Sequence, residues 1–240
     1  MPSILRDMEI DDGVVAGWCS LAGPSTVEMV AHSGVDLVCL DAQHGLLTDH
    51  DLLSAIQACG SVPALVRVAR NAPDAIARAL DRGAAGIIVP LVDSAAEAEA
   101  AVAACGYPPR GTRSFGPTRV GWTGRDVLAP GGCVIMIETM AAVADLAAIV
   151  AVPGVDAVFV GPSDLSLSSG RAAVPPLDDP GYRDLLRSVT GGSTVPVGVY
   201  CGDVEWAPIY RDLGFTWLTL PAEASLLRRG LASALERYRR

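Results

Sequence analysis

Eight short, mostly apolar runs alternate with segments of helical spacing along the 240 residues of the chain. The runs cover residues 14–20, 35–40, 62–68, 86–91, 134–137, 157–160, 195–200 and 216–220. Continuous apolar runs of this length are typical of parallel strands that are buried on both faces. No linker or change of composition divides the chain, so the pattern predicts one α/β domain over residues 1–240, a single (β/α)8 TIM barrel.

An open, doubly wound sheet is the alternative fold for such a pattern. That fold usually carries a GxGxxG turn after its first strand, and the sequence has none. In a barrel, chemistry collects on the loops that follow the strands. Polar residues beyond the ends of the apolar runs are therefore the candidates for function.

Composition excludes several functions. The net charge of −9 argues against nucleic acid or an anionic membrane as a partner. The acidic N-terminus lacks the apolar stretch of a signal peptide, which predicts a cytoplasmic protein. The six cysteines lack CxxC spacing, so we expect reduced core residues and neither disulfides nor zinc ligands.

All eighteen basic residues are arginine, and the chain has no lysine. An enzyme that forms a Schiff base needs a lysine amine. Lysine-dependent aldolases, pyridoxal-phosphate enzymes and Walker-type P-loops are therefore excluded.

Two carboxylates follow consecutive apolar runs in the second half of the chain. Glu138 comes directly after residues 134–137, and Asp164 comes shortly after residues 157–160. Alone, Glu138 could be a charge in the first turn of a helix, and Asp164 could be an N-cap. Together, on neighbouring strand ends, they suit a hard divalent cation such as Mg²⁺ or Mn²⁺.

Other polar residues expected at strand ends are Asp41, His44, Arg67, Arg70 and Arg113. His44 lies three residues after Asp41, a spacing that would let the carboxylate orient the imidazole ring of an acid–base pair. A buried Arg67 needs an anionic partner, either a substrate oxygen or a neighbouring carboxylate. Arg70 is expected to be a surface charge.

The longest loop expected in the chain covers residues 106–132 and is rich in Gly, Pro and Arg. Its segment 110–124 could be taken for a phosphate cradle. Without a lysine or a helix-initiating glycine pattern, we instead expect a loop that closes over a small acid or packs on a neighbouring subunit.

Over nearly its whole length the chain resembles the HpcH/HpaI family of metal-dependent pyruvate aldolases, whose relatives include citrate lyase β-like barrels. The segments that carry the resemblance are GWCSLAGP, LVCLDAQHG, ALVRV, GIIVPLV, YPPRGTRSFG, MIET, GVDAVFVGPSDLS and PAEASLLRRG. The order and spacing of MIET and GVDAVFVGPSDLS are the most specific of these features.

The resemblance implies a role for each candidate residue. Glu138 and Asp164 would bind the metal, Arg67 would bind the keto or enolate oxygen, and His44 with Asp41 would form the acid–base pair. The pyruvate carboxylate would lie against the backbone of Gly161, Pro162, Ser163 and Asp164. The family also implies a homohexamer, built as a trimer of dimers, in which the C-terminal helix packs on a neighbouring subunit.

One residue departs from the family pattern: Gln43 stands where many members have a glutamate before the histidine. The ligands, the arginine and the histidine are all retained.

The expected activity is that of a class II carbon–carbon lyase. With Mg²⁺, Mn²⁺ or Co²⁺, and without pyridoxal phosphate or a Schiff-base lysine, it would cleave a 4-hydroxy-2-oxo acid to pyruvate and an aldehyde. Two alternatives remain open at this point. One is another metal–enolate lyase or condensing enzyme that acts on citrate or a CoA thioester, and the other is a barrel that only binds small acids.

Overall fold

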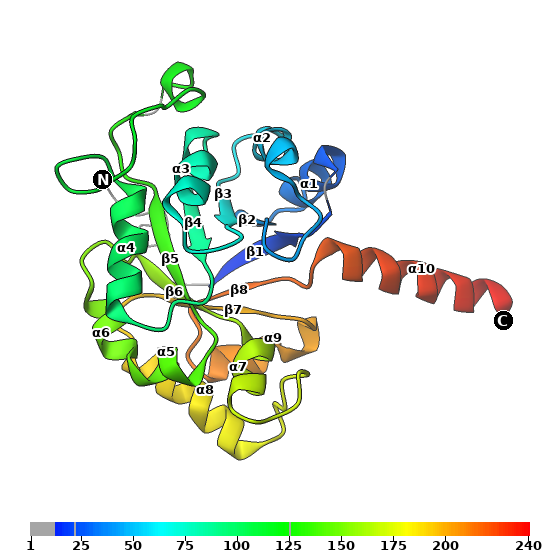
Figure 1. Ribbon diagram of the computed structural model, residues 1–240. Coiled ribbons are helices and arrows are strands. Elements are labelled where there is room, and N and C mark those ends of the chain that lie inside the picture. Colours follow the sequence, from blue (N-terminus) through cyan, green and yellow to red (C-terminus); the bar gives the residue numbers. More distant parts are fainter. Residues whose placement is uncertain (1–12, 22, 125) are drawn as a thin grey trace.

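The computed structural model describes residues 13–21, 23–124 and 126–240. Eight parallel strands pair in chain order, and the last strand pairs with the first to close a barrel (Figure 1). The closure joins Val14 to Trp217 and Ala16 to Thr219 in register. The predicted (β/α)8 architecture is therefore confirmed, and the doubly wound alternative is wrong.

The described strands are β1 (Val14–Cys19), β2 (Leu37–Asp41), β3 (Ala64–Arg67), β4 (Gly86–Val89), β5 (Gly132–Ile137), β6 (Ala157–Val160), β7 (Val197–Tyr200) and β8 (Trp217–Thr219). The α-helices are α1 (Pro24–Ala31), α2 (Asp49–Ala58), α3 (Pro73–Asp81), α4 (Ala95–Cys105), α5 (Met140–Ala144), α6 (Leu146–Ala151), α7 (Pro162–Ser168), α8 (Pro180–Gly192), α9 (Ala207–Asp212) and α10 (Glu223–Arg239). Two short 3₁₀ helices are η1 (Val120–Trp122) and η2 (Val204–Trp206).

Alternate residues of each strand build two separate cores. Side chains such as Leu65, Phe159 and Trp217 fill the barrel interior. Their neighbours, such as Val66 and Val158, pack outward against the helices. All six cysteines are buried and free, as the composition predicts.

Two helical segments differ from the pattern expected from the sequence. The crossover between β5 and β6 is not one helix, because it breaks at Asp145 into α5 and α6. The Asp145 carboxylate accepts a hydrogen bond from the backbone N–H of Ala95 at 2.8 Å, which ties this break to α4. The segment after β6 forms α7, whose N-cap is Gly161, so Asp164 lies in the first turn and is not the N-cap.

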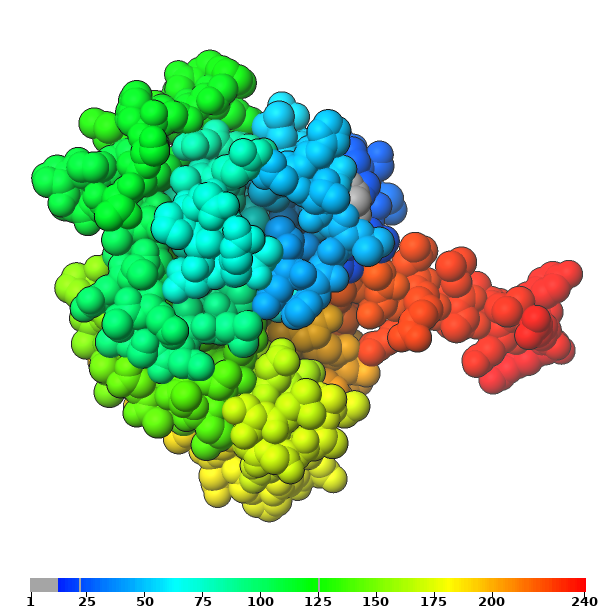
Figure 2. All heavy atoms as spheres, viewed as in Figure 1, coloured from blue at the N-terminus to red at the C-terminus, as the bar shows by residue number. Residues whose placement is uncertain are grey.

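The last helix, α10, projects away from the barrel as an arm (Figures 1 and 2). Its base is fixed by Glu223, which is 6% exposed and accepts hydrogen bonds from the backbone N–H groups of Ser20 and Leu21 at 2.6–2.9 Å. Along the arm, large apolar side chains are exposed, namely Leu226, Leu227, Leu231, Leu235 and Tyr238. None of the described helices is long and apolar enough to cross a membrane.

Candidate active site

A cavity of about 290 Å³ opens at the carboxyl ends of the strands. Its polar lining includes Ser20, Asp41, His44, Arg67 and Asp164, and its aromatic lining is Trp18, Phe159 and Tyr200. Gly161, Pro162 and Ser163 complete one edge at the start of α7. In barrels of this type, the carboxyl ends of the strands are where catalytic groups gather.

Arg67 and Asp41 form a buried ion pair at the floor of this cavity. They are the last residues of β3 and β2 and lie opposite each other in the strand register. Arg67 donates from Nε to Oδ1 of Asp41 at 2.8 Å and from its terminal nitrogen to Oδ2 at 2.6 Å. Its guanidinium carbon also lies 4.8 Å from the centre of the Trp18 ring. The pair fixes a cation within the cavity in a single orientation.

The electrostatics of Asp41 follow from this pairing. Burial opposes ionisation, but the hydrogen bonds and charge of Arg67 hold the pKa of Asp41 below its usual value. The backbone N–H groups of Gln43 and His44 add bonds to Oδ1 at 3.0 and 3.2 Å. These interactions favour the anionic form of Asp41, which also shapes the turn after β2.

His44 lines the cavity, but its ring makes no hydrogen bond with Asp41 among the described residues. Both Asp41 oxygens already bind Arg67, and the contact with His44 is through its backbone N–H. Asp41 therefore fixes the backbone of the loop that carries His44 and does not fix the tautomer of the His44 ring. Gln43 does not line the cavity, and its side-chain oxygen is buried without a partner among the described residues.

Glu138 follows β5 and is 3% exposed. Its Oε1 accepts a hydrogen bond from the backbone N–H of Leu91 at 2.7 Å. A Cβ at Gly161 would lie 2.8 Å from Oε2, so a glycine there leaves the space that the carboxylate needs. Burial, and next the charge of Asp164, raise the pKa of Glu138, although the Leu91 bond lowers it.

Asp164 faces the cavity from the exposed first turn of α7. Tyr182 supports this helix by donating a hydrogen bond to the carbonyl of Pro162 at 2.6 Å. The charge of Asp164 adds to the cost of ionising Glu138, and a cation bound by the two carboxylates would offset that cost. Within the described residues, no cluster of three or more His, Cys, Asp or Glu side chains offers a complete protein-only metal site.

The sequence reasoning missed the aromatic wall of the cavity. Trp18 stacks on Phe159, with ring centres 5.6 Å apart, and meets Tyr200 edge-on at 5.4 Å. In the sequence these residues read as ordinary core positions. The available signal was their place on the inward-facing register near the carboxyl ends of β1, β6 and β7.

Arg113 does not lie at the strand ends where it was expected. It lies on the loop between α4 and β5, and that loop enters the amino end of the barrel. Its side chain pairs with Asp81 and lines a second cavity of about 670 Å³, far from the first set of residues. Arg70 is exposed and pairs with Asp74, as expected of a surface charge.

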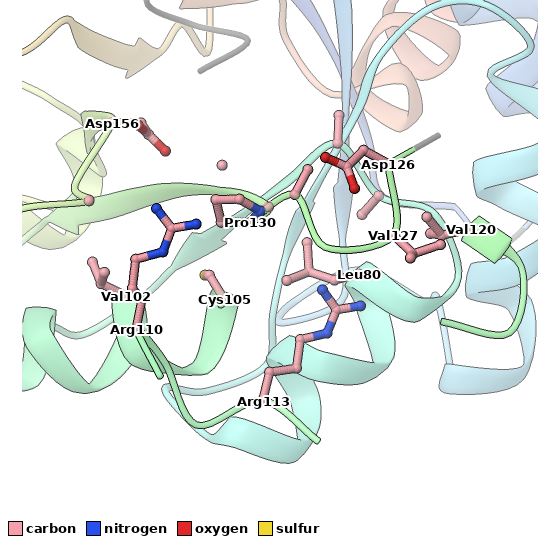
Figure 3. A pocket seen from close by; sticks show the side chains of 16 residues that line it. Leu80, Val102, Cys105, Arg110, Arg113, Val120, Asp126, Val127, Pro130 and Asp156 are labelled. Carbon is pink, nitrogen blue, oxygen red and sulfur yellow. The ribbon is translucent and has the colours of Figure 1, made fainter. Parts of the chain in front are cut away.

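Figure 3 shows this second cavity, which Arg110 and Arg113 enter from the loop while Asp126 and Asp156 lie at opposite sides. It is larger than the cavity at the carboxyl ends, but its walls are mostly apolar, and Arg113 is its one residue among the candidates from the sequence. The described part of the loop lies at the amino end of its own barrel and contributes no residue to the strand-end cavity. Closure of the loop over a small acid stays a prediction. Packing of the loop on a neighbouring subunit stays a prediction.

Comparisons with known proteins agree with this geometry. The chain is 35% identical over 226 residues to a 2-dehydro-3,6-dideoxy-6-sulfogluconate aldolase of Pseudomonas putida, covering 88% of this chain and 86% of the relative. It is also 35% identical over 227 residues to a hydroxypyruvate/pyruvate aldolase of Rhizorhabdus wittichii, covering 89% of each.

A crystal structure of an HpcH/HpaI aldolase/citrate lyase family protein from Burkholderia cenocepacia matches with a TM-score of 0.86 at 29% identity, over 96% of both chains. The family model described as HpcH/HpaI aldolase/citrate lyase matches residues 15–179. That range includes every predicted site residue from Asp41 to Asp164. The chain therefore belongs to the HpcH/HpaI aldolase/citrate lyase family and is an aldolase-type carbon–carbon lyase.

Proposed function

We propose that the chain, as a single domain, is a divalent-metal-dependent aldolase that reversibly cleaves a 4-hydroxy-2-oxo acid to pyruvate and an aldehyde. One observation carries the proposal. The Asp164 carboxylate lines the same strand-end cavity as the buried Arg67–Asp41 pair, and Oε2 of Glu138 lies against Gly161 at the edge of that cavity, where the charge of Asp164 acts on it. The names of the relatives, which are aldolases, support the same activity.

Glu138 and Asp164 would hold the metal, for which Mg²⁺, Mn²⁺ and Co²⁺ are the candidates. The pKa of Glu138, raised first by burial and also by the charge of Asp164 despite the opposing charge of Arg67, supports this, because a bound cation would offset both causes. When bound, the metal supplies a Lewis acid that stabilises negative charge on the keto oxygen of the substrate. A chain without lysine has no Schiff base for the same purpose.

Arg67 would bind the keto oxygen and the enolate that develops from it. Two of its five N–H groups bond Asp41, and the other three have no partner among the described residues. Because Asp41 and Trp18 already fix the guanidinium, no reorganisation is needed when charge develops on the substrate. Asp41 then acts as a positioning residue for Arg67 and for the turn that carries His44.

His44 would act as the general base. It removes the proton of the 4-hydroxyl group, the C3–C4 bond breaks, and the electron pair remains on the pyruvate fragment as an enolate. Protonation at C3 then completes pyruvate, and the reverse sequence makes the new bond. The backbone N–H groups at the start of α7, after Pro162, would bind the pyruvate carboxylate, because first-turn N–H groups lack helical partners.

A retro-aldol screen tests the proposal. A panel of 4-hydroxy-2-oxo acids is incubated with Mg²⁺, Mn²⁺ or Co²⁺, and pyruvate release is measured with and without a chelator. We expect release that stops on chelation and returns when metal is restored. Chelator-resistant release would contradict the metal role. Consumption of a CoA thioester or citrate without pyruvate release would support a related lyase or condensing enzyme, and no turnover would favour a barrel that only binds acids.

We also propose that α10 packs on another copy of the chain in a homo-oligomer, with a hexamer as the expected state. The arm projects from the barrel (Figure 2), and the exposed apolar side chains along it would otherwise stay in water. Replacing Leu227 and Leu231 together by Glu should reduce the mass measured by light scattering, whereas Arg237→Glu on the same helix should not. An unchanged mass of the double variant would refute this packing. Buried free cysteines support a cytoplasmic location.

A further inference from the structure

Leu91 has an unusual backbone for its residue type. Among the described residues it is the one non-glycine with positive φ, at 54°. Leucine is disfavoured there because its Cβ crowds the backbone. The residue is 61% exposed, so burial does not compensate for the strain. Strained backbone that persists in a fold is often held for a functional reason.

The strained residue directs one donor at a site residue. The N–H of Leu91 bonds Oε1 of Glu138 at 2.7 Å, while Oε2 lies against Gly161 at the start of the helix that carries Asp164. Since φ sets the orientation of the N–H relative to the chain that follows, an ordinary negative φ at Leu91 would not let this N–H face Oε1 while Val92 stays buried and Asp93 keeps its bond with Thr139. Glu138 would then lose the contact that fixes its carboxylate.

Contacts on both sides hold the loop in this conformation. Before Leu91, Pro90 is buried, and after it Val92 is fully buried. The hydroxyl of Thr139, the residue after Glu138, donates to Asp93. The loop after β4 is thus bound to the segment that carries Glu138 at two points, Leu91 and Asp93.

We propose that Leu91 is a positioning residue for the metal ligand Glu138, and that its left-handed backbone aims the N–H at Oε1 so that Oε2 is directed towards Asp164. The inference rests on the proposed metal site. Partners that orient a ligating carboxylate usually change metal affinity about 10–100-fold when they are lost. The effect should come from the backbone conformation and not from the leucine side chain.

The test compares substitutions that differ in their tolerance of positive φ. Leu91→Ile introduces a β-branched residue that resists this region, whereas Leu91→Gly and Leu91→Asn accept it. Mn²⁺ binding is measured by calorimetry on the full chain, and Tm is measured in chelator. We expect Leu91→Ile to bind Mn²⁺ at least tenfold more weakly, and Leu91→Gly and Leu91→Asn to bind within about twofold of the wild type. Leu128→Ile, at an equally exposed leucine of the amino-end loop, is the matched control and should not change binding.

Three results would overturn the inference, two of them in Mn²⁺ affinity. One is wild-type Mn²⁺ affinity in Leu91→Ile, and the other is an equal loss of affinity in Leu91→Gly, which would assign the effect to the side chain. A loss of Tm alone would show a purely structural role and would also overturn it. Glu138→Ala separates this inference from the metal site itself. Weak binding in Glu138→Ala with normal binding in Leu91→Ile rejects only the role of Leu91, whereas normal binding in Glu138→Ala rejects the metal site.

Discussion

Arg67 and Arg113 are held in nearly the same way at opposite ends of the barrel. Both are more than nine-tenths buried. Arg67 pairs with Asp41 and stacks over Trp18, with 4.8 Å between the guanidinium carbon and the ring centre. It uses both Nε and a terminal nitrogen, so the pair has two hydrogen bonds.

Arg113 pairs with Asp81 and stacks over Tyr107 at 4.7 Å. Its pair has one hydrogen bond, and its Nε is buried without a partner among the described residues. At both sites a buried arginine pairs with an aspartate and stacks on an aromatic ring, and the cavity lined by Arg113 is the larger of the two. What separates them is position. The Arg67 pair lies at the carboxyl ends of the strands, where Asp164 lines the same cavity and Glu138 lies against Gly161 at its edge, whereas the Arg113 pair lies at the amino end.

The largest expected effect comes from removing one acidic residue at each end. Glu138→Ala should lower pyruvate release by more than about 10³-fold and abolish metal-dependent stabilisation, because it deletes a ligand and a charge at the reacting centre. Asp126→Ala at the amino-end cavity should leave both unchanged, because among the described residues the Asp126 carboxylate bonds only the backbone N–H of Leu128 in its own loop. Equal losses in the two variants would remove the functional distinction between the ends.

The arginines themselves give the second test. Arg67→Ala should reduce kcat/KM by about 10²–10³-fold, the usual cost of one preorganised electrostatic stabiliser. Arg113→Ala should keep kcat/KM. Both should lose stability, and Arg67→Ala should lose more, on the order of 3–5 kcal/mol, because Asp41 is left fully buried while Asp81 is 26% exposed.

Because Arg67→Ala could fold poorly, Arg67→Lys is the second variant to measure. It keeps the charge beside Asp41 but loses the two-pronged geometry, so it should fold and still be about 10²-fold less active. Full activity of Arg67→Lys would show that charge alone, and not the orientation set by Asp41 and Trp18, is what the reaction uses.

The histidines provide a third and smaller contrast. His44→Ala should lower kcat by about 10²-fold, the lower end for general acid–base catalysis, because Asp41 does not hold its ring. The acid limb of the pH profile should also change, which is a readout that a loss of stability would not produce. His50→Ala, at the exposed start of α2, is the control. An unaltered pH profile in His44→Ala would remove His44 as the base.

The fold was predictable because buried parallel strands leave a strong record in the sequence. Runs such as 157–160 coincide with strand β6, and the adjacency of Asp41 and Arg67 follows from their places at the ends of consecutive strands. The position of Arg113 could also have been predicted correctly, since a loop that leads from a helix to the next strand lies at the amino end of a barrel. That error came from reading residue type without reading topology.

Other features of the site could not be predicted from the residues alone. Whether the Asp41 carboxylate accepts hydrogen bonds from Arg67 or from the His44 ring depends on side-chain positions that differ by less than an ångström. Leu91 gives no signal, because an exposed leucine after a proline predicts neither a left-handed backbone nor a bond to Glu138. The aromatic wall needs the barrel to be closed before Trp18 and Phe159 meet.

The smallest effect is one of stability. The pKa of Glu138 is raised in the fold by burial and by Asp164, so the folded state holds this proton more tightly than the unfolded state. Stability is therefore lost as pH rises from the ordinary value of a glutamate through the raised pKa, and the cost is complete above it. Glu138→Gln removes the charge, so without metal the variant should unfold a few degrees higher than the wild type at pH 7, since 1 kcal/mol corresponds to about 2–4 °C in a domain of this size.

Bound metal should make the wild type more stable than Glu138→Gln. This reversal would distinguish a carboxylate that binds metal from one with only a structural role. A cation at one hundred times its Kd adds about 2.7 kcal/mol to the folded state that binds it, and it should do so for the wild type but not for Glu138→Gln. The two Tm values measured by scanning calorimetry should therefore cross between chelator and saturating Mn²⁺. The control is Asp81→Asn, which removes the partner of Arg113 and should be destabilised equally in both conditions. If Mn²⁺ raised the Tm of Glu138→Gln as much as that of the wild type, the cation would bind elsewhere. The carboxyl end of the barrel would then not be distinguished from the amino end by a metal site.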